Sequence, residues 1–456
     1  MKTRIALSTI VLMVLTIFLA TSAMAQVTAS GVVGLKAQLS HGYIEADKPQ
    51  EIYGSIDMRA QELRTERRVP MNLSVVLDRS GSMSGERWVQ ARRATRDLIN
   101  MLSEQDRLSL VTYGSDVTLE FASMYATPRN KRKMLSAVDA LQISGMTNLS
   151  GGLEMGIGQT QAHAKDDTIN RVIMMSDGNA NVGITSVEGL GALARAGLEV
   201  GVSTSTLGFG LDYNSTLMTK MAVEGAGNYY FIEREDALAG IFAQEISGIS
   251  NTVARNSRVV IDLADGVELL ELHGFTHRQQ GNRVTIPLTE FYARQSKDIF
   301  VKLHTSAKET GKQPIMNVRL IYFDVAADRE VTLRVNLEAV STRDSALVEE
   351  HINGAVLARG QHIDIANSMK RAMTRYEEGK PQEAAKILEE QRTRTGAARV
   401  QYDFADGESF ERVEKEMAKM EDDIKANPSP RSAPAQRMRK QSSKRSHDMV
   451  QSIEAF

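Results

Sequence analysis

The chain has 456 residues, a formal net charge of −2 and no cysteine. Its length predicts about two to four compact units, and its nearly balanced charge gives no overall indication of nucleic acid or of acidic substrates. The lack of cysteine excludes disulfides, zinc thiolate sites, thiol catalysis and a lipid anchor on an N-terminal cysteine.

Residues 1–25 have the pattern of an export signal. Lys2 and Arg4 precede an apolar stretch from Ile5 to Ala20, and Ala23-Met24-Ala25 fits the small-x-small cleavage rule, which predicts a mature chain that starts at Gln26. Since the apolar stretch is long for a signal, an uncleaved membrane anchor is the alternative. We expect an exported bacterial protein, periplasmic or secreted, because an exported chain without cysteine is typical of that compartment. No later segment reaches the ~20 apolar residues of a membrane span.

The chain then changes from strands alone to alternating strands and helices. Short apolar alternation predicts an N-terminal β segment over 26–68. From 70 to 250, apolar runs predict strands over 72–77, 107–113, 117–121, 171–176, 199–207 and 228–232. Apolar spacing and capping residues predict helices over 86–102 and 128–141, after Asn214 and over 238–249. This alternation predicts an α/β domain with a doubly wound, mostly parallel sheet.

The second half of the chain predicts two further units. Residues 255–341 alternate with a period of two, which predicts a β-sandwich domain. We expect strands from 26–68 to complete it, so that the α/β domain is inserted in the sandwich or flanked by it. Helical periodicity returns over 345–424, where a turn at Gly379-Lys380-Pro381 predicts two antiparallel helices without a repeated copy. The Pro-, Ser-, Arg- and Lys-rich stretch 425–456 predicts a disordered tail.

The most informative motif, Asp78-Arg79-Ser80-Gly81-Ser82, ends an apolar strand and brings a carboxylate and two hydroxyls to one point. Thr147 supplies a third hydroxyl, and Asp177 follows another apolar run. Ligands of open α/β sheets bind at the carboxyl ends of the strands, where Asp78 and Asp177 fall. Oxygen ligands without nitrogen or sulfur suit Mg²⁺, with Mn²⁺ and Ca²⁺ as alternatives.

Two simpler interpretations stand beside the metal site. Asp78 to Ser82 has the composition of an N-cap cluster for the helix over 86–102, although Thr147 and Asp177 favour the metal. The glycines at 151, 152, 156 and 158 lack the Gly-Lys-Ser/Thr of a phosphate loop, so we expect loose helix packing there.

With Asp78, Ser80, Ser82, Thr147 and Asp177 on this scaffold, residues 71–250 resemble a von Willebrand factor type A (VWA) domain with a metal-ion-dependent adhesion site. The three motifs occur in the family's order, although Met146 stands where many relatives have glycine. The resemblance implies that the three hydroxyls contact the cation, while the two aspartates act largely through water. The whole layout is similar to exported bacterial proteins, some of them grouped with calcium-activated-chloride-channel-like sequences.

The resemblance implies a protein that binds rather than an enzyme. A cation held by neutral hydroxyls keeps an affinity for a further oxygen, so we expect a protein ligand that supplies an Asp or Glu carboxylate, in adhesion or in assembly of an envelope complex. A Mg²⁺-dependent hydrolase is the alternative, but the sequence indicates no nucleophile–base pair, second metal or cationic clamp. A channel regulator is a further alternative, which rests on analogy alone. The sequence leaves the oligomeric state and the partner's identity open.

Overall fold

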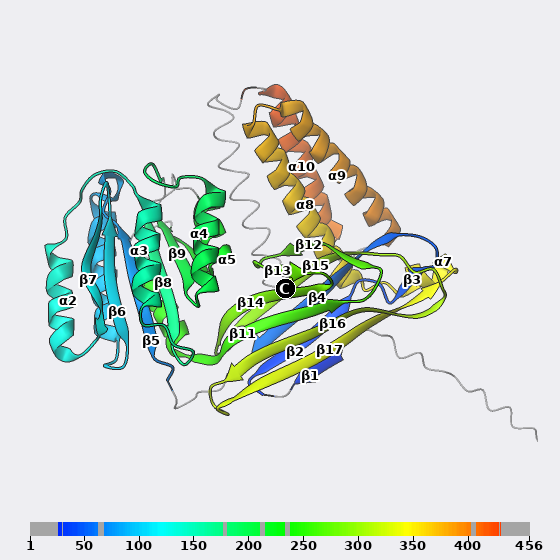
Figure 1. The fold of residues 1–456 in the computed structure, drawn as a ribbon. Helices are drawn as coiled ribbons and strands as arrows, with labels where there is room; N and C mark the ends of the chain where they lie inside the picture. Colours follow the sequence, from blue (N-terminus) through cyan, green and yellow to red (C-terminus); the bar gives the residue numbers. More distant parts are fainter. Residues whose placement is uncertain are drawn as a thin grey trace, which may run out of the picture.

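The computed structural model describes residues 26–29, 31–62, 68–176, 180–209, 215–232, 238–402, 407–427 and 429. The predicted signal and nearly all of the predicted tail lie outside these residues. Figure 1 shows an α/β domain beside a β sandwich, from which a group of long helices rises. In the described part of the chain, no helix is long and apolar enough to span a membrane.

The α/β domain contains a six-stranded sheet in the order β10-β9-β8-β5-β6-β7. Every neighbouring pair is parallel except the antiparallel β6–β7 hairpin. The predicted mostly parallel sheet is therefore confirmed. Its strands are β5 (Met71–Asp78), β6 (Arg107–Tyr113), β7 (Val117–Tyr125), β8 (Ile169–Ser176), β9 (Ser203–Phe209) and β10 (Ala226–Ile232).

Helices cover both faces of this sheet, because successive residues of the buried central strand point to opposite sides. Val75 and Leu77 of β5 share a core with α1 (Glu86–Met101), α2 (Pro128–Ala140) and α6 (Leu238–Ser250). Val76 belongs to a second core with α3 (Leu149–Gln161), α4 (Val187–Glu199) and α5 (Ser215–Glu224). A short 3₁₀ turn, η1 (Gly81–Met83), joins β5 to α1.

Two sequence expectations in this domain were wrong. The strand expected over 199–207 starts only at Ser203, because α4 extends to Glu199. Three glycines in α4 weaken its helical pattern, so the sequence did not predict it. Three of the four glycines of α3 pack tightly rather than loosely, and a Cβ on Gly156 would lie 2.5 Å from Val76 of β5. Gly158 is the exception, because a Cβ there would meet nothing within 4 Å.

The β sandwich is assembled from both sides of the α/β domain. Its sheets have the orders β1-β2-β4-β15-β12 and β13-β14-β11-β16-β17-β3. β4 precedes the α/β domain and pairs antiparallel with β15, which follows it, so that the α/β domain is inserted in the sandwich as predicted. The first sheet comprises β1 (Gln26–Ala29), β2 (Val33–Leu39), β4 (Gln50–Ala60), β15 (Ser296–Thr305) and β12 (Val267–His273). The second comprises β13 (Arg278–Gln280), β14 (Arg283–Tyr292), β11 (Thr252–Leu263), β16 (Gly311–Asp324), β17 (Arg329–Thr342) and β3 (Tyr43–Glu45).

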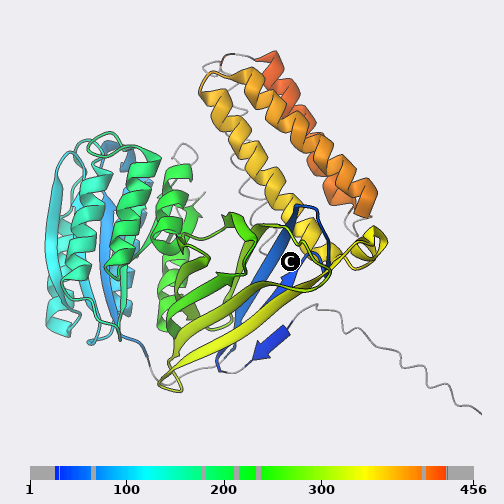
Figure 2. The same cartoon turned by 45° about the vertical axis from the view of Figure 1, so that its right-hand side comes forward.

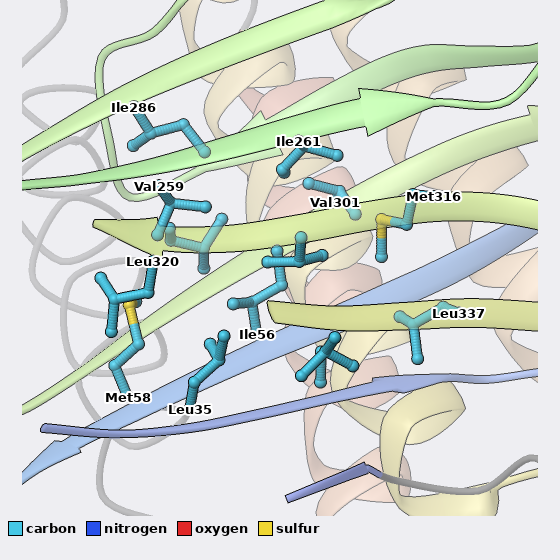
Figure 3. Close-up of a cluster of buried hydrophobic side chains, with 14 of the residues drawn as sticks. Leu35, Ile56, Met58, Val259, Ile261, Ile286, Val301, Met316, Leu320 and Leu337 are labelled. Carbon is cyan, nitrogen blue, oxygen red and sulfur yellow. The ribbon is translucent and has the colours of Figure 1, made fainter. Parts of the chain in front are cut away.

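Branched apolar side chains of the two sheets meet in the sandwich core. Figure 3 shows Ile56 and Val301 from the first sheet among Val259, Ile261 and Leu320 from the second, and all five are buried. The core therefore includes residues from both sequence segments that flank the inserted domain, and it holds the ends of that domain together.

The helical region consists of α7 (Ser345–Glu350), α8 (Gly354–Glu377), α9 (Pro381–Tyr402) and α10 (Gly407–Ala426). The predicted antiparallel pair is confirmed by α8 and α9, which are separated at Gly379. α10 extends past residue 425, where the tail was expected to begin. α8 is fixed to the sandwich, since the Tyr53 hydroxyl donates to Asp364 Oδ2 at 2.8 Å. Figure 2 shows the helices rising from the sandwich, with their far ends inclined towards the side on which the α/β domain lies.

Candidate metal-binding site

Asp78, the last residue of β5, is buried at the carboxyl edge of the parallel sheet. Its two carboxylate oxygens have different donors. Oδ1 accepts from the backbone N–H of Ser80 at 2.8 Å, and Oδ2 accepts from the hydroxyl of Ser176 at 2.8 Å. These bonds fix the orientation of the carboxylate and join the ends of β5 and β8.

The two serines of the motif lie side by side in the turn after β5. Ser80 Oγ and Ser82 Oγ are 3.0 Å apart, Ser80 being buried and Ser82 exposed. Adjacent ligands of an octahedral ion with metal–oxygen distances of about 2.1 Å are separated by about 3.0 Å. The separation of the serine hydroxyls therefore fits two neighbouring ligands of one magnesium ion.

Thr147 is buried in a loop that is bonded to the turn after β5. The N–H of Gly81 donates to the carbonyl of Gly145 at 3.2 Å, and the N–H of Ser144 donates to the carbonyl of Arg79 at 2.7 Å. These two bonds hold the Thr147 loop against the serines. The structure thus joins the two segments that carry four of the five predicted residues, Asp78, Ser80, Ser82 and Thr147, although these segments are more than 60 residues apart in the sequence.

Asp177, the fifth predicted residue, lies outside the described residues. The residue before it, Ser176, ends β8 and donates to Asp78. Because β8 runs parallel to β5, with Met175 opposite Leu77, the described part of β8 ends at the same edge of the sheet as the motif.

Asn181 is a residue of the site region that the sequence reasoning missed. Its Oδ1 accepts from the N–H of Thr147 at 2.8 Å, and its own N–H donates to the carbonyl of Thr147 at 3.1 Å. Asn181 therefore fixes the backbone of the residue that supplies the third hydroxyl. Its position four residues after Asp177 was the one available signal, and it is not specific.

The alternative N-cap interpretation of the motif is wrong. α1 begins at Glu86 with Gly85 as its N-cap, and no side chain caps this helix end. Ser80 precedes η1 but makes no side-chain cap bond to it. The Asp78 carboxylate instead accepts from the Ser80 N–H and the Ser176 hydroxyl, and the hydroxyls of Ser80 and Ser82 bond to each other.

Comparison with known families supports the assignment of the fold. A model of the von Willebrand factor type A domain matches residues 72–244. The solved structure of a von Willebrand factor type A protein from Catenulispora acidiphila aligns with a TM-score of 0.62 at 15% identity, covering 80% of this chain and 89% of that one. The ArnB paralog VWA2 from Sulfolobus acidocaldarius aligns with a TM-score of 0.57 at 15% identity, covering 90% and 98%. Residues 72–244 form a VWA domain, and this chain is a VWA-containing protein.

Curated relatives are similar to part of this chain. YfbK of Escherichia coli is 31% identical over 209 residues, which are 45% of this chain and 36% of that protein. The protein sll0103 of Synechocystis is 25% identical over 343 residues, 71% of this chain and 78% of its own length. Human inter-alpha-trypsin inhibitor heavy chain H3 is 32% identical over 165 residues, 35% of this chain and 18% of that protein. The chain thus spans about a third of YfbK and less than a fifth of the human protein. VWA domains typically mediate protein–protein interaction and metal-dependent binding.

Proposed function

We propose that this protein binds a protein partner through a divalent cation held at the carboxyl edge of the VWA sheet. Ser80, Ser82 and Thr147 would contact the ion, Asp78 and Asp177 would act from the next layer, and a partner's Asp or Glu would take an open coordination position. The observation that supports this most directly is the pair of serine hydroxyls 3.0 Å apart beside a fixed carboxylate. Mg²⁺ is the proposed ion, with Mn²⁺ or Ca²⁺ as alternatives.

The hydrogen bonds of Asp78 explain why a cation at this site would attract a partner's carboxylate. Both of its oxygens already accept hydrogen bonds from protein donors, so its charge acts on the site mainly as a fixed background. Hydroxyl ligands are neutral, and an ion that they hold keeps much of its positive charge. Mg²⁺ keeps exchangeable ligands in such open sites. An incoming carboxylate would therefore gain a charge-assisted contact that water cannot match.

The setting that we propose is the bacterial envelope, where such a protein would serve adhesion or the assembly of a complex without catalysing a reaction. The export pattern of residues 1–25 supports this setting. The partner is identified here only by its chemistry, an exposed carboxylate on a protein surface.

The test is crosslinking of the full chain in native envelopes, followed by mass spectrometry, with Mg²⁺ and with EDTA. Ser82→Ala is the informative variant, because Ser82 is exposed and we therefore expect the variant to fold normally. Ser136→Ala, an exposed serine on α2 outside the site, is the matched control. We expect partner capture to need Mg²⁺ and to fall at least tenfold in Ser82→Ala. Equal capture in EDTA, in Ser82→Ala and in the control would remove the proposal.

A further inference from the structure

A groove of about 660 Å³ lies between α8 and α9, in the helices that rise from the sandwich. This volume is typical of a ligand-binding pocket. α8 with its C-cap contributes residues from Ser368 to Glu378 and α9 contributes residues from Ile387 to Arg394, while α10 contributes none. The groove is therefore formed by two facing helix surfaces.

Positive charge predominates along the groove. Lys370, Arg371, Arg375 and Arg394 line it, against the acids Glu378 and Glu390. Both acids already have cationic neighbours: Glu378 pairs with Arg375 at 2.8 Å and with Lys380 at 3.2 Å, and Glu390 lies 3.8 Å from Lys386.

Two of the groove's cations have no acidic partner in the part of the chain that the structure describes. Lys370 and Arg394 are exposed, one on each wall, and neither forms an ion pair with a described residue. An acidic ligand could thus neutralise both walls without displacing an existing pair.

The floor of the groove is polar and fixed. Ser368 and Gln391 are buried, and the Ser368 hydroxyl donates to Gln391 Oε1 at 3.0 Å between the helices. Arg371 Nη2 donates to the same hydroxyl at 2.9 Å, which holds its guanidinium at the edge of the groove. If the contact between α8 and α9 served only stability, we would expect apolar residues at these buried positions. Met369 of α8 and Leu388 of α9 are such residues elsewhere in the same helix pair.

We propose that this groove binds an acidic, extended segment of a partner protein. The ten-residue separation from Ser368 to Glu378 corresponds to about 15 Å along the helix axis. An extended chain of about four to five residues spans this length. Cations distributed along the walls suit several carboxylates in a row, whereas a single small anion would need its donors to converge on one point. This site is separate from the metal site and needs no cation.

The probe is a fluorescein-labelled peptide of consecutive glutamates, and its counterpart with glutamine in place of glutamate is the reference. Binding to the full chain is measured by fluorescence anisotropy in EDTA and at low salt, so that a metal-dependent site cannot contribute. The double variant Lys370→Gln/Arg394→Gln removes one exposed cation from each wall. Arg412→Gln, an exposed cation of α10 outside the groove, is the matched control.

We expect the glutamate peptide to bind about tenfold more weakly to the double variant than to the wild type, to Arg412→Gln or to Asp78→Ala, and to be released by added salt. Equal affinity in the double variant, or equal binding of the glutamine peptide, would overturn the proposal. Displacement of the peptide by an equal concentration of inorganic phosphate would also overturn it, because the groove would then be a site for free anions. Since EDTA is present throughout, these outcomes do not depend on whether the metal site exists.

Discussion

The two ends of the VWA sheet use polar side chains in opposite ways, and strand β8 contributes to both. At the carboxyl end, Ser176 orients Asp78 beside two serine hydroxyls that face each other near the surface. At the amino end, Arg171 is fully buried, with Nη1 2.7 Å from Glu245 Oε1 of α6 and 2.6 Å from the hydroxyl of Tyr292 in the sandwich.

The polar groups at the amino end are bonded to one another across the two domains. Arg171 also pairs with Glu290 of β14, and Glu245 accepts from Ser205 at 2.7 Å and from Tyr230 at 2.6 Å. Burial is the largest single influence and opposes the ionised form of Glu245, but the charge of Arg171 and the hydrogen bonds that Glu245 accepts together outweigh it and lower the pKa of that carboxyl. The amino end is therefore a structural joint between the VWA domain and the sandwich, whereas the carboxyl end carries the residues of the proposed metal site.

The joint gives the largest expected effect. Arg171→Met leaves Glu245 and Glu290 buried without their cation, and breaking a buried pair in this way costs about 3–5 kcal/mol. We expect urea unfolding to detect this loss, while Mg²⁺ affinity in the folded protein stays unchanged. Arg278→Met, which removes an exposed pair with Glu199, is the control and costs at most about 1 kcal/mol. Equal costs in the two variants would contradict the assignment of Arg171 as a joint.

The next largest expected effect is a change in thermal stability when the proposed metal site binds Mg²⁺. A ligand that binds only the folded state stabilises it by about 2.7 kcal/mol at a hundred times its dissociation constant. We expect Mg²⁺ to raise the melting temperature of the wild type and EDTA to reverse the rise. Asp78→Ala removes the acceptor for the Ser80 N–H and for the Ser176 hydroxyl, so the variant should lose this response. A melting temperature insensitive to Mg²⁺ in the wild type would argue against the site.

The contrast between the two ends of the sheet also explains why the sequence predicted the residues of one end and not those of the other. Asp78, Ser80 and Ser82 lie within one pentapeptide at the end of an apolar strand, so spacing alone predicted that they would meet. Arg171, Glu245 and Tyr292 are distant in sequence and belong to two domains, and no local pattern relates them. Tertiary packing decides which of these polar groups are buried together. It leaves no periodic pattern in the sequence from which their burial could be predicted.

Helices and strands were likewise predicted where their local sequence pattern was strong and missed where it was weak. The period-two alternation of the sandwich strands was strong, because each strand has one face in the core. Strands from 26–68 complete the sandwich as expected, with β4 paired to β15. The Gly-rich helix α4 and Asn181 escaped prediction, since glycine weakens helical periodicity and a lone asparagine has no spacing to recognise.

Lys297 gives a pH-dependent prediction at the joint. Burial, with the charge of Arg171, lowers the pKa of its amine from 10.5 to about 7. Between these values the unfolded chain binds a proton that the folded chain does not, so stability rises with pH from about 7 to 10.5. Lys297→Met removes this penalty, so we expect it to stabilise the protein at pH 6, by about 2 kcal/mol for a half-buried amine, and to have no effect near pH 10.5. Chemical denaturation at both pH values checks this, and a gain larger at high pH would reverse the sign.

The smallest expected effect comes from a substitution at Gly145, where the loop that carries Thr147 of the proposed metal site lies close to Ser115. Gly145 has φ +80°, and a Cβ there would lie 2.3 Å from Ser115 Oγ and 2.7 Å from the Ser115 nitrogen. Gly145→Ala combines a left-handed backbone with this clash, and we expect a loss of about 1–2 kcal/mol together with weaker Mg²⁺ binding. Gly158→Ala is the matched control, because its Cβ would meet nothing within 4 Å and alanine favours the α3 helix by about 1 kcal/mol. Calorimetric titration measures the Mg²⁺ affinity of both variants and so distinguishes an effect of the loops from an effect of the helix. If Gly145→Ala bound Mg²⁺ as tightly as Gly158→Ala, the position of Thr147 would not depend on the close approach that Gly145 permits.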